Sequence, residues 1–184
     1  MIFLNIRTNF NSTFANRGMS LENDINESNK YYVDYDIALI YKKPTPIRIT
    51  KTNYKNMRIT DGFFESPSTL DYNGVYKGYY IEFDAKETRS KTSFPIDNIH
   101  KQQIEYIRKV IKHNGIVFLI VRFSTLNRDF VISGKDIIDY INNNERKSIP
   151  LSYFENNTYE IGIKYTPRLD YIKIVDKLIN EHNN

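Results

Sequence analysis

The stretch that decides the fold is TLDYNGVYKGYYIEFDAKE, which occupies residues 69–87. Residues 79–86 are rich in aromatic and β-branched side chains, and we expect a strand there and a shorter one at residues 69–72. Asn73-Gly74 lies between them and is typical of a tight hairpin turn. The sequence therefore predicts two neighbouring antiparallel strands.

Three side chains of this predicted hairpin carry useful chemistry: Asp71, Asp84 and Lys86. Side chains two apart on a strand face the same side, so Asp71 shares a face with Thr69. For the same reason Asp84 shares a face with Lys86, and the two pairs can converge. Two carboxylates can hold Mg²⁺, and an adjacent lysine can orient water or stabilise charge on a phosphate. The pattern predicts metal-assisted phosphodiester cleavage.

The same triplet has a simpler explanation. An acid-x-Lys pattern is common on solvated strands, where the charges form only surface ion pairs. Ile81, Phe83 and Ala85 alternate with charged residues, as expected for a strand with one apolar face. Taken alone, these residues are as consistent with a solvent-exposed surface strand as with a metal site.

The rest of the chain alternates predicted helices and strands. We expect helices at residues 17–32, 98–113, 136–142 and 171–181, and further strands at 36–41, 116–123 and 128–133. The run at 116–123 is almost wholly apolar, which is typical of a strand covered on both faces. This order predicts an α/β fold with a central mixed sheet flanked by helices. We expect one domain over residues 16–184, preceded by a mobile N-terminal arm at residues 1–15.

A long basic and aromatic segment at residues 51–68 predicts a protrusion rather than an ordinary connection. Cations cluster here and just before it, with no acid until Asp61: Lys42, Lys43, Arg48, Lys51, Lys55 and Arg58. Such cations bind a phosphate backbone, and aromatic residues such as Phe63 and Phe64 can stack on unpaired bases. A solvated loop with its aromatic side chains packed on the body would explain the same pattern.

The amino-acid composition limits the kinds of catalytic and metal-binding site that the chain can form. The chain has 184 residues, a net charge of +4, three histidines and no cysteine. Disulfides, thiolate metal sites and cysteine catalysis are excluded, and a metal would be held mainly by oxygens. The apolar runs are too short for a membrane helix, and the first residues turn polar too early for a signal peptide. We therefore expect a cytoplasmic protein.

Four segments, in this order and spacing, resemble the RecU Holliday-junction resolvases of bacteria, a family of the PD-(D/E)xK nuclease superfamily: NRGMSLENDINESNKYY, KKPTPIRI, STLDYNGVYKGYYIEFDAKET and FPIDNIHKQQIEY. The resemblance runs from about Asn16 to beyond Phe123. It implies a restriction-endonuclease-like fold and a homodimer that nicks four-way DNA junctions symmetrically, in recombination and DNA repair. It implies Mg²⁺ as the cofactor, with Mn²⁺ as a substitute. A RecA-type recombinase and a branch-migration helicase are the implied partners.

The resemblance also assigns residues. The implied metal-site residues are Thr69, Asp71, Asp84 and Gln103. Lys86 is implied as the transition-state stabiliser, and Glu22, after the Arg-Gly-Met element, as a catalytic acid near the metal. Residues 51–68 match the family's stalk, which reaches into the junction centre. We expect DNA contacts from Arg17, Lys51, Lys55, Arg58 and Arg89.

The chain departs from the family's pattern in three places. Asp84 stands where the family usually has Glu, so its side chain is one methylene shorter. Gln102 stands where the family often has His, and the arm before Asn16 is short. The sequence therefore leaves two alternatives open. One is a junction-binding or recombinase-regulating protein with impaired catalysis, and the other is an endonuclease of the same superfamily that acts on duplex DNA.

Overall fold

A six-stranded mixed sheet lies at the centre of the computed structural model, which describes residues 20–64 and 69–183. In spatial order its strands are β1 (Leu39–Lys42), β4 (Tyr72–Tyr76), β5 (Tyr79–Thr88), β7 (Ile116–Phe123), β8 (Arg128–Ser133) and β10 (Tyr159–Ile161). β5 and β7 run parallel, and the other neighbouring pairs run antiparallel. The predicted α/β fold with a mixed sheet is confirmed. The expected N-terminal arm and Arg17 lie outside the described residues.

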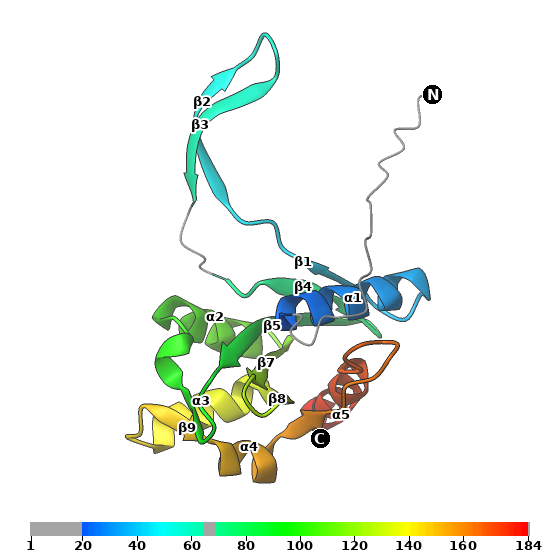
Figure 1. Ribbon diagram of the computed structural model, residues 1–184, viewed down its shortest axis with the longest axis vertical. Coiled ribbons are helices and arrows are strands. Elements are labelled where there is room, and N and C mark those ends of the chain that lie inside the picture. Colours follow the sequence, from blue (N-terminus) through cyan, green and yellow to red (C-terminus); the bar gives the residue numbers. More distant parts are fainter. Residues whose placement is uncertain (1–19, 65–68, 184) are drawn as a thin grey trace.

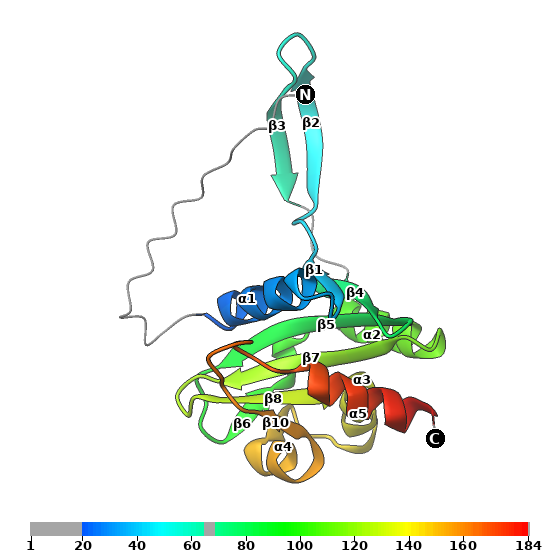
Figure 2. The ribbon, with the colours of Figure 1, turned by 90° about the vertical axis from the view of Figure 1, so that its right-hand side faces the viewer.

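Helices cover both faces of this sheet. On one face lie α1 (Leu21–Asp34) and α5 (Ile172–Asn183), and on the other lie α2 (Lys101–Lys112) and α3 (Gly134–Asn143) (Figure 2). Every residue of β7 is buried between them. Phe118 and Ile120 pack on the α1 and α5 side, whereas Leu119 and Val121 pack on the opposite side. The prediction of a strand covered on both faces is confirmed.

The first helix begins later than the sequence suggested. Ser20 is its N-cap, and the Ser20 side chain accepts a hydrogen bond of 3.4 Å from the Asn23 backbone N–H. A hydroxyl in this position satisfies one of the free N–H groups at a helix start, which fixes the boundary. The apolar stripe of Leu21, Ile25 and Tyr32 is buried as predicted.

The hairpin turn was predicted at the wrong place. β4 and β5 are joined at Lys77 and Gly78, whose φ angles of 50° and 85° are those of a tight turn. Asn73-Gly74 lies inside β4, opposite β5. A Cβ at Gly74 would lie 1.9 Å from the Leu39 carbonyl oxygen, so this glycine permits the close approach of β1.

Two other predicted strands are shifted. The strand expected at residues 69–72 begins only at Tyr72, so Thr69 and Asp71 precede it. The strand expected at 36–41 is β1, which starts at Leu39 after Asp36 takes a left-handed conformation with φ of 53°. The prediction that Thr69 and Asp71 share a face of one strand is therefore wrong.

A two-stranded ribbon extends away from the sheet (Figure 1). It consists of β2 (Ile47–Asn53) and β3 (Arg58–Phe64), paired antiparallel, and every residue in both strands is exposed. The sequence placed a protrusion at residues 51–68, whereas the ribbon spans residues 47–64, and its strands were not predicted. Because neither face of the ribbon packs on a core, no clean alternation of apolar and polar residues marks it. Residues 65–68 lie outside the described part.

Short elements complete the fold and were not predicted: β6 (Ser93–Pro95), η1 (Ile96–Asn98), β9 (Ser148–Pro150), α4 (Leu151–Asn157) and β10. The helix expected at 98–113 is divided, because η1 ends at Asn98 and α2 begins only after its N-cap, His100. Within residues 20–64 and 69–183, no helix is long and apolar enough to cross a membrane.

Candidate active site

The charged face of β5 is covered by α2. Ile81, Phe83 and Ala85 pack in the core beneath α1 and α5, so Glu82, Asp84 and Lys86 point the other way. Asp84 is only 1% exposed, and the Lys86 side chain is 15% exposed. A solvated strand with surface ion pairs is therefore the wrong explanation for this face.

Asp84, Lys86 and Gln103 form a closed set of contacts. Asp84 Oδ2 accepts a hydrogen bond of 2.6 Å from Gln103 Nε2 and forms an ion pair of 3.0 Å with Lys86 Nζ. Lys86 Nζ donates in turn to Gln103 Oε1 at 3.1 Å. Gln103 Oε1 also accepts from the His100 backbone N–H at 3.2 Å, within the capping box that starts α2. The start of α2 thus holds both charged groups of β5 in place.

One oxygen of Asp84 remains without a protein partner. Among the described residues, Asp84 Oδ1 is buried and has no hydrogen-bond donor. A buried polar atom without a partner is costly, and such an atom calls for an explanation such as a bound ion. The described residues contain no group of three His, Cys, Asp or Glu side chains placed to hold a metal. A cation here would rely on fewer carboxylates and on water, which suits Mg²⁺.

Asp71 is coupled to this carboxylate through its charge. Burial raises the pKa of Asp71, and the negative charge of Asp84 raises it further. Lys86 and Lys42 act in the opposite direction and lower the pKa of Asp71, whereas Glu22 raises it. A cation between two such carboxylates would relieve their repulsion. The structure thus brings Asp84, Lys86 and Gln103 into direct contact, and Asp71 interacts with Asp84 and Lys86 through its charge.

Two predicted site residues are less closely connected. The Thr69 hydroxyl donates to the Leu70 carbonyl oxygen at 3.4 Å, and its role at a metal stays a prediction. Glu22 lies at the start of α1, and its half-exposed side chain accepts a hydrogen bond of 2.5 Å from Lys42 Nζ. Its charge reaches Asp71, but its catalytic role also stays a prediction.

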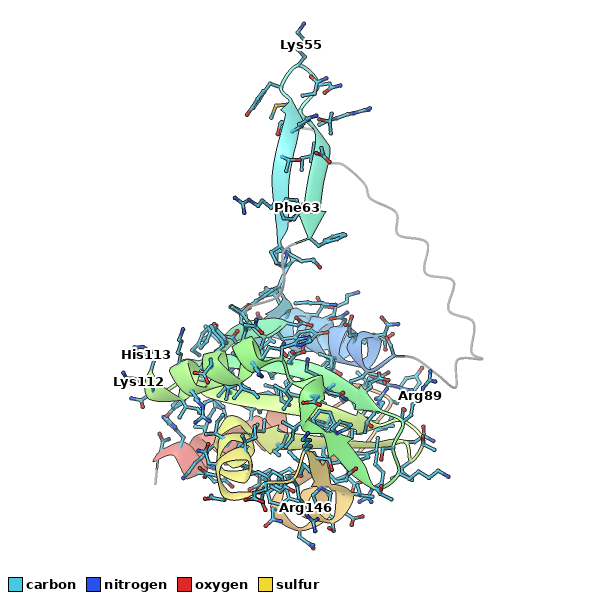
Figure 3. All side chains as sticks on the ribbon, turned by 90° about the vertical axis from the view of Figure 1, so that its left-hand side faces the viewer. Lys55, Phe63, Arg89, Lys112, His113 and Arg146 are labelled. Carbon is cyan, nitrogen blue, oxygen red and sulfur yellow. The ribbon has the colours of Figure 1, made fainter. Side chains whose placement is uncertain are left out.

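The predicted DNA contacts fall in two places. Lys51 and Arg58 lie in the strands of the ribbon, and Lys55 lies at its tip (Figure 3). Arg89 directly follows β5 on the body, far from Lys55 in that view. The DNA-binding role of all four residues stays a prediction.

A second buried carboxylate lies beside the site and was missed as a functional candidate. Glu82 is 0% exposed and forms an ion pair with Lys43, which the sequence grouped with the free cations of the basic segment. Tyr80 and Tyr106 donate their hydroxyls to the same carboxylate. The sequence signal was the spacing of Glu82, which places it on the same face of β5 as Asp84.

Fold and site together define a class. A central mixed sheet flanked by helices, with an Asp-x-Lys pattern on one of its inner strands and a further Asp directly before the neighbouring strand, is the arrangement of restriction-endonuclease-like proteins. Residues 16–177 match the RecU family, described as Recombination protein U. The chain is 47% identical over 175 residues to the Holliday junction resolvase RecU of Staphylococcus aureus strains JH9, JH1 and Mu3. The match covers 92% of this chain and 84% of each relative. The chain belongs to the RecU family.

Proposed function

We propose that this protein is a homodimeric, Mg²⁺-dependent endonuclease that resolves four-way DNA junctions by symmetric nicks in recombination and DNA repair. The observation that carries the proposal is the Asp84 carboxylate. One of its oxygens is fixed by Gln103 and Lys86, while the other is buried and has no donor among the described residues. Family membership points to the substrate, because the similar Staphylococcus aureus proteins are named Holliday junction resolvases.

Asp71 and Asp84 are the residues that would hold the metal. Mg²⁺ bound there would neutralise charge on the scissile phosphate and acidify a bound water. Because the pKa of Asp71 is raised, its carboxylate loses its proton less readily than an ordinary aspartate. The site is therefore assembled fully only when the pH is high enough to ionise Asp71.

Lys86 is the group that would stabilise the transition state. Its ammonium is held by Asp84 at 3.0 Å and by Gln103 at 3.1 Å, so it needs little reorganisation during the reaction. An ammonium has three donors, which leaves one for the phosphate or the attacking water. Partial burial strengthens its interaction with developing negative charge.

The ribbon is the part that would give preference for a junction over a linear duplex. It carries Lys51, Lys55 and Arg58, and the exposed side chains of Phe63 and Phe64 lie near its base. The cations would bind phosphates without reading sequence, and the aromatic rings would pack on unstacked bases at the centre of a junction.

The sheet edge offers a surface for a second copy of the chain. Leu39 pairs with Val75, and Val75 with Tyr80, so these side chains form one row across β1, β4 and β5. They are 52%, 50% and 40% exposed, and Tyr41 of β1 is 55% exposed. Exposed apolar groups in a row favour a protein interface, and a two-fold dimer would present two equivalent sites to a junction.

Cleavage of matched DNA substrates tests the proposal. A labelled four-way junction and a linear duplex of the same arms are incubated with the protein, with and without Mg²⁺. We expect paired nicks in the junction only with Mg²⁺, and little cutting of the duplex. Equal cutting of both substrates would favour the duplex-acting alternative. Tight junction binding without any cutting would favour the binding or regulatory alternative.

The dimer is tested separately by light scattering. Leu39→Glu places a charge in the exposed apolar row and should convert a dimer to monomers. Ile163→Glu is the matched control, because Ile163 is 47% exposed and lies elsewhere, bridged to Leu169. A wild-type protein that is monomeric at every concentration, or a Leu39→Glu dimer as strong as wild type, would contradict this interface.

A further inference from the structure

Glu82 differs from Asp84 in the use of its oxygens. Glu82 Oε1 accepts from Lys43 Nζ, and Oε2 accepts from the hydroxyls of Tyr80 and Tyr106, the latter at 2.9 Å. Burial and the hydrogen bond to Glu82 raise the pKa of Tyr106, so its hydroxyl stays a donor. With both oxygens engaged, Glu82 is suited to hold other groups and not to bind a metal.

Lys43 is held at both its side chain and its main chain. It directly follows β1, where the chain leaves the sheet for the ribbon. Its ammonium pairs with Glu82 and lies 5.5 Å from the centre of the Tyr106 ring. Its backbone N–H donates a hydrogen bond of 2.7 Å to the Asp71 carbonyl oxygen. Lys43 therefore joins Glu82 of β5 to the main chain of Asp71.

This connection matters because Asp71 lies outside a regular element, whereas its neighbours in the site lie within a strand or a helix. Asp84 and Lys86 are on the most central part of the sheet, and Gln103 is in the first turn of α2. Asp71 precedes β4 and lies on the chain segment that returns from the ribbon. The Lys43–Asp71 hydrogen bond joins the outgoing and returning segments at the edge of the sheet. The bond lies one residue beyond the last β1–β4 pair, Lys42 with Tyr72, so it extends the pairing of the two segments as far as Asp71.

We propose that Glu82 is a positioning residue that, through Lys43, holds the main chain of Asp71 so that the Asp71 and Asp84 carboxylates face one cation. Glu82 and Asp84 are two residues apart on one face of β5, so the anchor and the second carboxylate share one strand. The effect of Glu82 on metal-dependent cleavage rests on the proposed function, whereas its structural part, the holding of the Asp71 main chain through Lys43, does not. Substitution of a residue that orients a metal ligand without touching the metal typically lowers metal affinity or activity about 10- to 100-fold.

The structural part is tested by amide hydrogen exchange in metal-free protein. Glu82→Gln keeps the size of the side chain and removes its charge, and we expect exchange of the Lys43 amide to become at least about tenfold faster. Amides of β7 should not change. Because Lys43 keeps its charge in that variant, Lys43→Met/Glu82→Gln, which removes both charges, is measured beside it. If the amide at position 43 is as protected in both variants as in wild type, relative to its intrinsic exchange rate, the proposal is overturned.

Asp129→Asn is the matched control for the loss of a buried charge elsewhere in the sheet. Asp129 is 0% exposed and pairs with Arg122, on strands β8 and β7, away from Lys43. We expect this variant to lose stability while the Lys43 amide stays protected. If exchange of the Lys43 amide is accelerated as much in Asp129→Asn as in Glu82→Gln, this amide reports a general loss of stability, and the proposal is overturned.

Metal binding tests the consequence without relying on cleavage. Titration calorimetry with Mn²⁺ alone should give about tenfold weaker binding for Glu82→Gln than for wild type. In junction cleavage, the half-saturating Mg²⁺ concentration should rise similarly, and excess Mg²⁺ should restore the rate. A purely structural role would lower the unfolding temperature and leave both metal dependences unchanged. If wild type does not cut junctions, the proposed function fails, while hydrogen exchange and Mn²⁺ binding still decide the role of Glu82.

Discussion

Asp71→Asn should stabilise the metal-free protein. The pKa of Asp71 is raised by burial and by the charge of Asp84, so the folded chain holds the ionised carboxylate at a cost. Lys86 and Lys42 offset part of that cost, and Asp71 is only half-buried. We therefore expect a gain in unfolding free energy of about 0.5–1 kcal/mol, the lower part of the range for stabilising substitutions. For a chain of 184 residues this corresponds to roughly 1–4 °C in the unfolding temperature.

The gain should depend on pH in a defined direction. A raised pKa means that the folded chain binds a proton more readily than the unfolded chain, whose Asp has a pKa near 3.8. Wild type therefore loses stability as the pH rises from about 3.8 through the folded pKa of Asp71. Asn cannot ionise, so the difference between variant and wild type should be close to zero at low pH and full at neutral pH.

Thermal unfolding in EDTA measures this difference, with Asp170→Asn as a control of opposite sign. Burial tends to raise the pKa of Asp170, but hydrogen bonds from Lys164 and Lys173 outweigh it and lower that pKa. The control should therefore be less stable than wild type at neutral pH, with the deficit disappearing as the pH falls. The reasoning is refuted if Asp71→Asn is less stable than wild type at pH 7. It is also refuted if the unfolding temperatures of variant and wild type differ by the same amount at all pH values.

Three further predictions concern the same site and the ribbon. Gln103→Ala removes the donor to Asp84 and should lower the unfolding free energy by about 1–3 kcal/mol, whereas the exposed Gln102→Ala should stay within about 0.5 kcal/mol in denaturant titrations. Lys86→Met should slow junction cleavage about 100-fold or more with little loss of junction binding. Because Lys86 lowers the pKa of Asp71, the acid limb of the cleavage profile of Lys86→Met should also move to higher pH, and an unmoved limb would contradict this coupling. Lys51→Ala/Lys55→Ala should reduce the slope of log K against log salt for junction binding by about 0.9 for each cation that contacts a phosphate. An unchanged slope would show that the ribbon is not part of the DNA interface.

The buried strands were predictable because burial on two faces leaves a plain pattern. Residues 116–123 and 128–133 were predicted with the bounds that β7 and β8 have. The alternation of β5 was also predictable, since Ile81 and Phe83 had to face a core and Asp84 had to face away from it. What the alternation did not reveal was that α2 covers the charged side and makes Asp84 a buried group.

The errors came from residues whose role depends on a distant neighbour. Gly74 resembled a turn residue, but the approach of β1 requires it, and β1 is more than thirty positions earlier in the chain. Lys43 resembled a free cation until Glu82 was found beside it. The ribbon has no core, so its strands left no periodic signal. Local patterns could not reveal the contacts of Gly74 and Lys43, because each joins segments far apart in the sequence, whereas the strands of the ribbon were missed because they pack on no core.

The most direct test of the account is one comparison on a single four-way junction. Wild type and Asp71→Asn are each assayed for junction binding and, under single-turnover conditions, for cleavage with and without Mg²⁺. The account predicts that both proteins bind alike, that only wild type cuts, and that it cuts only with Mg²⁺. Cleavage by Asp71→Asn at the wild-type rate, or binding without cleavage by both proteins, would contradict it.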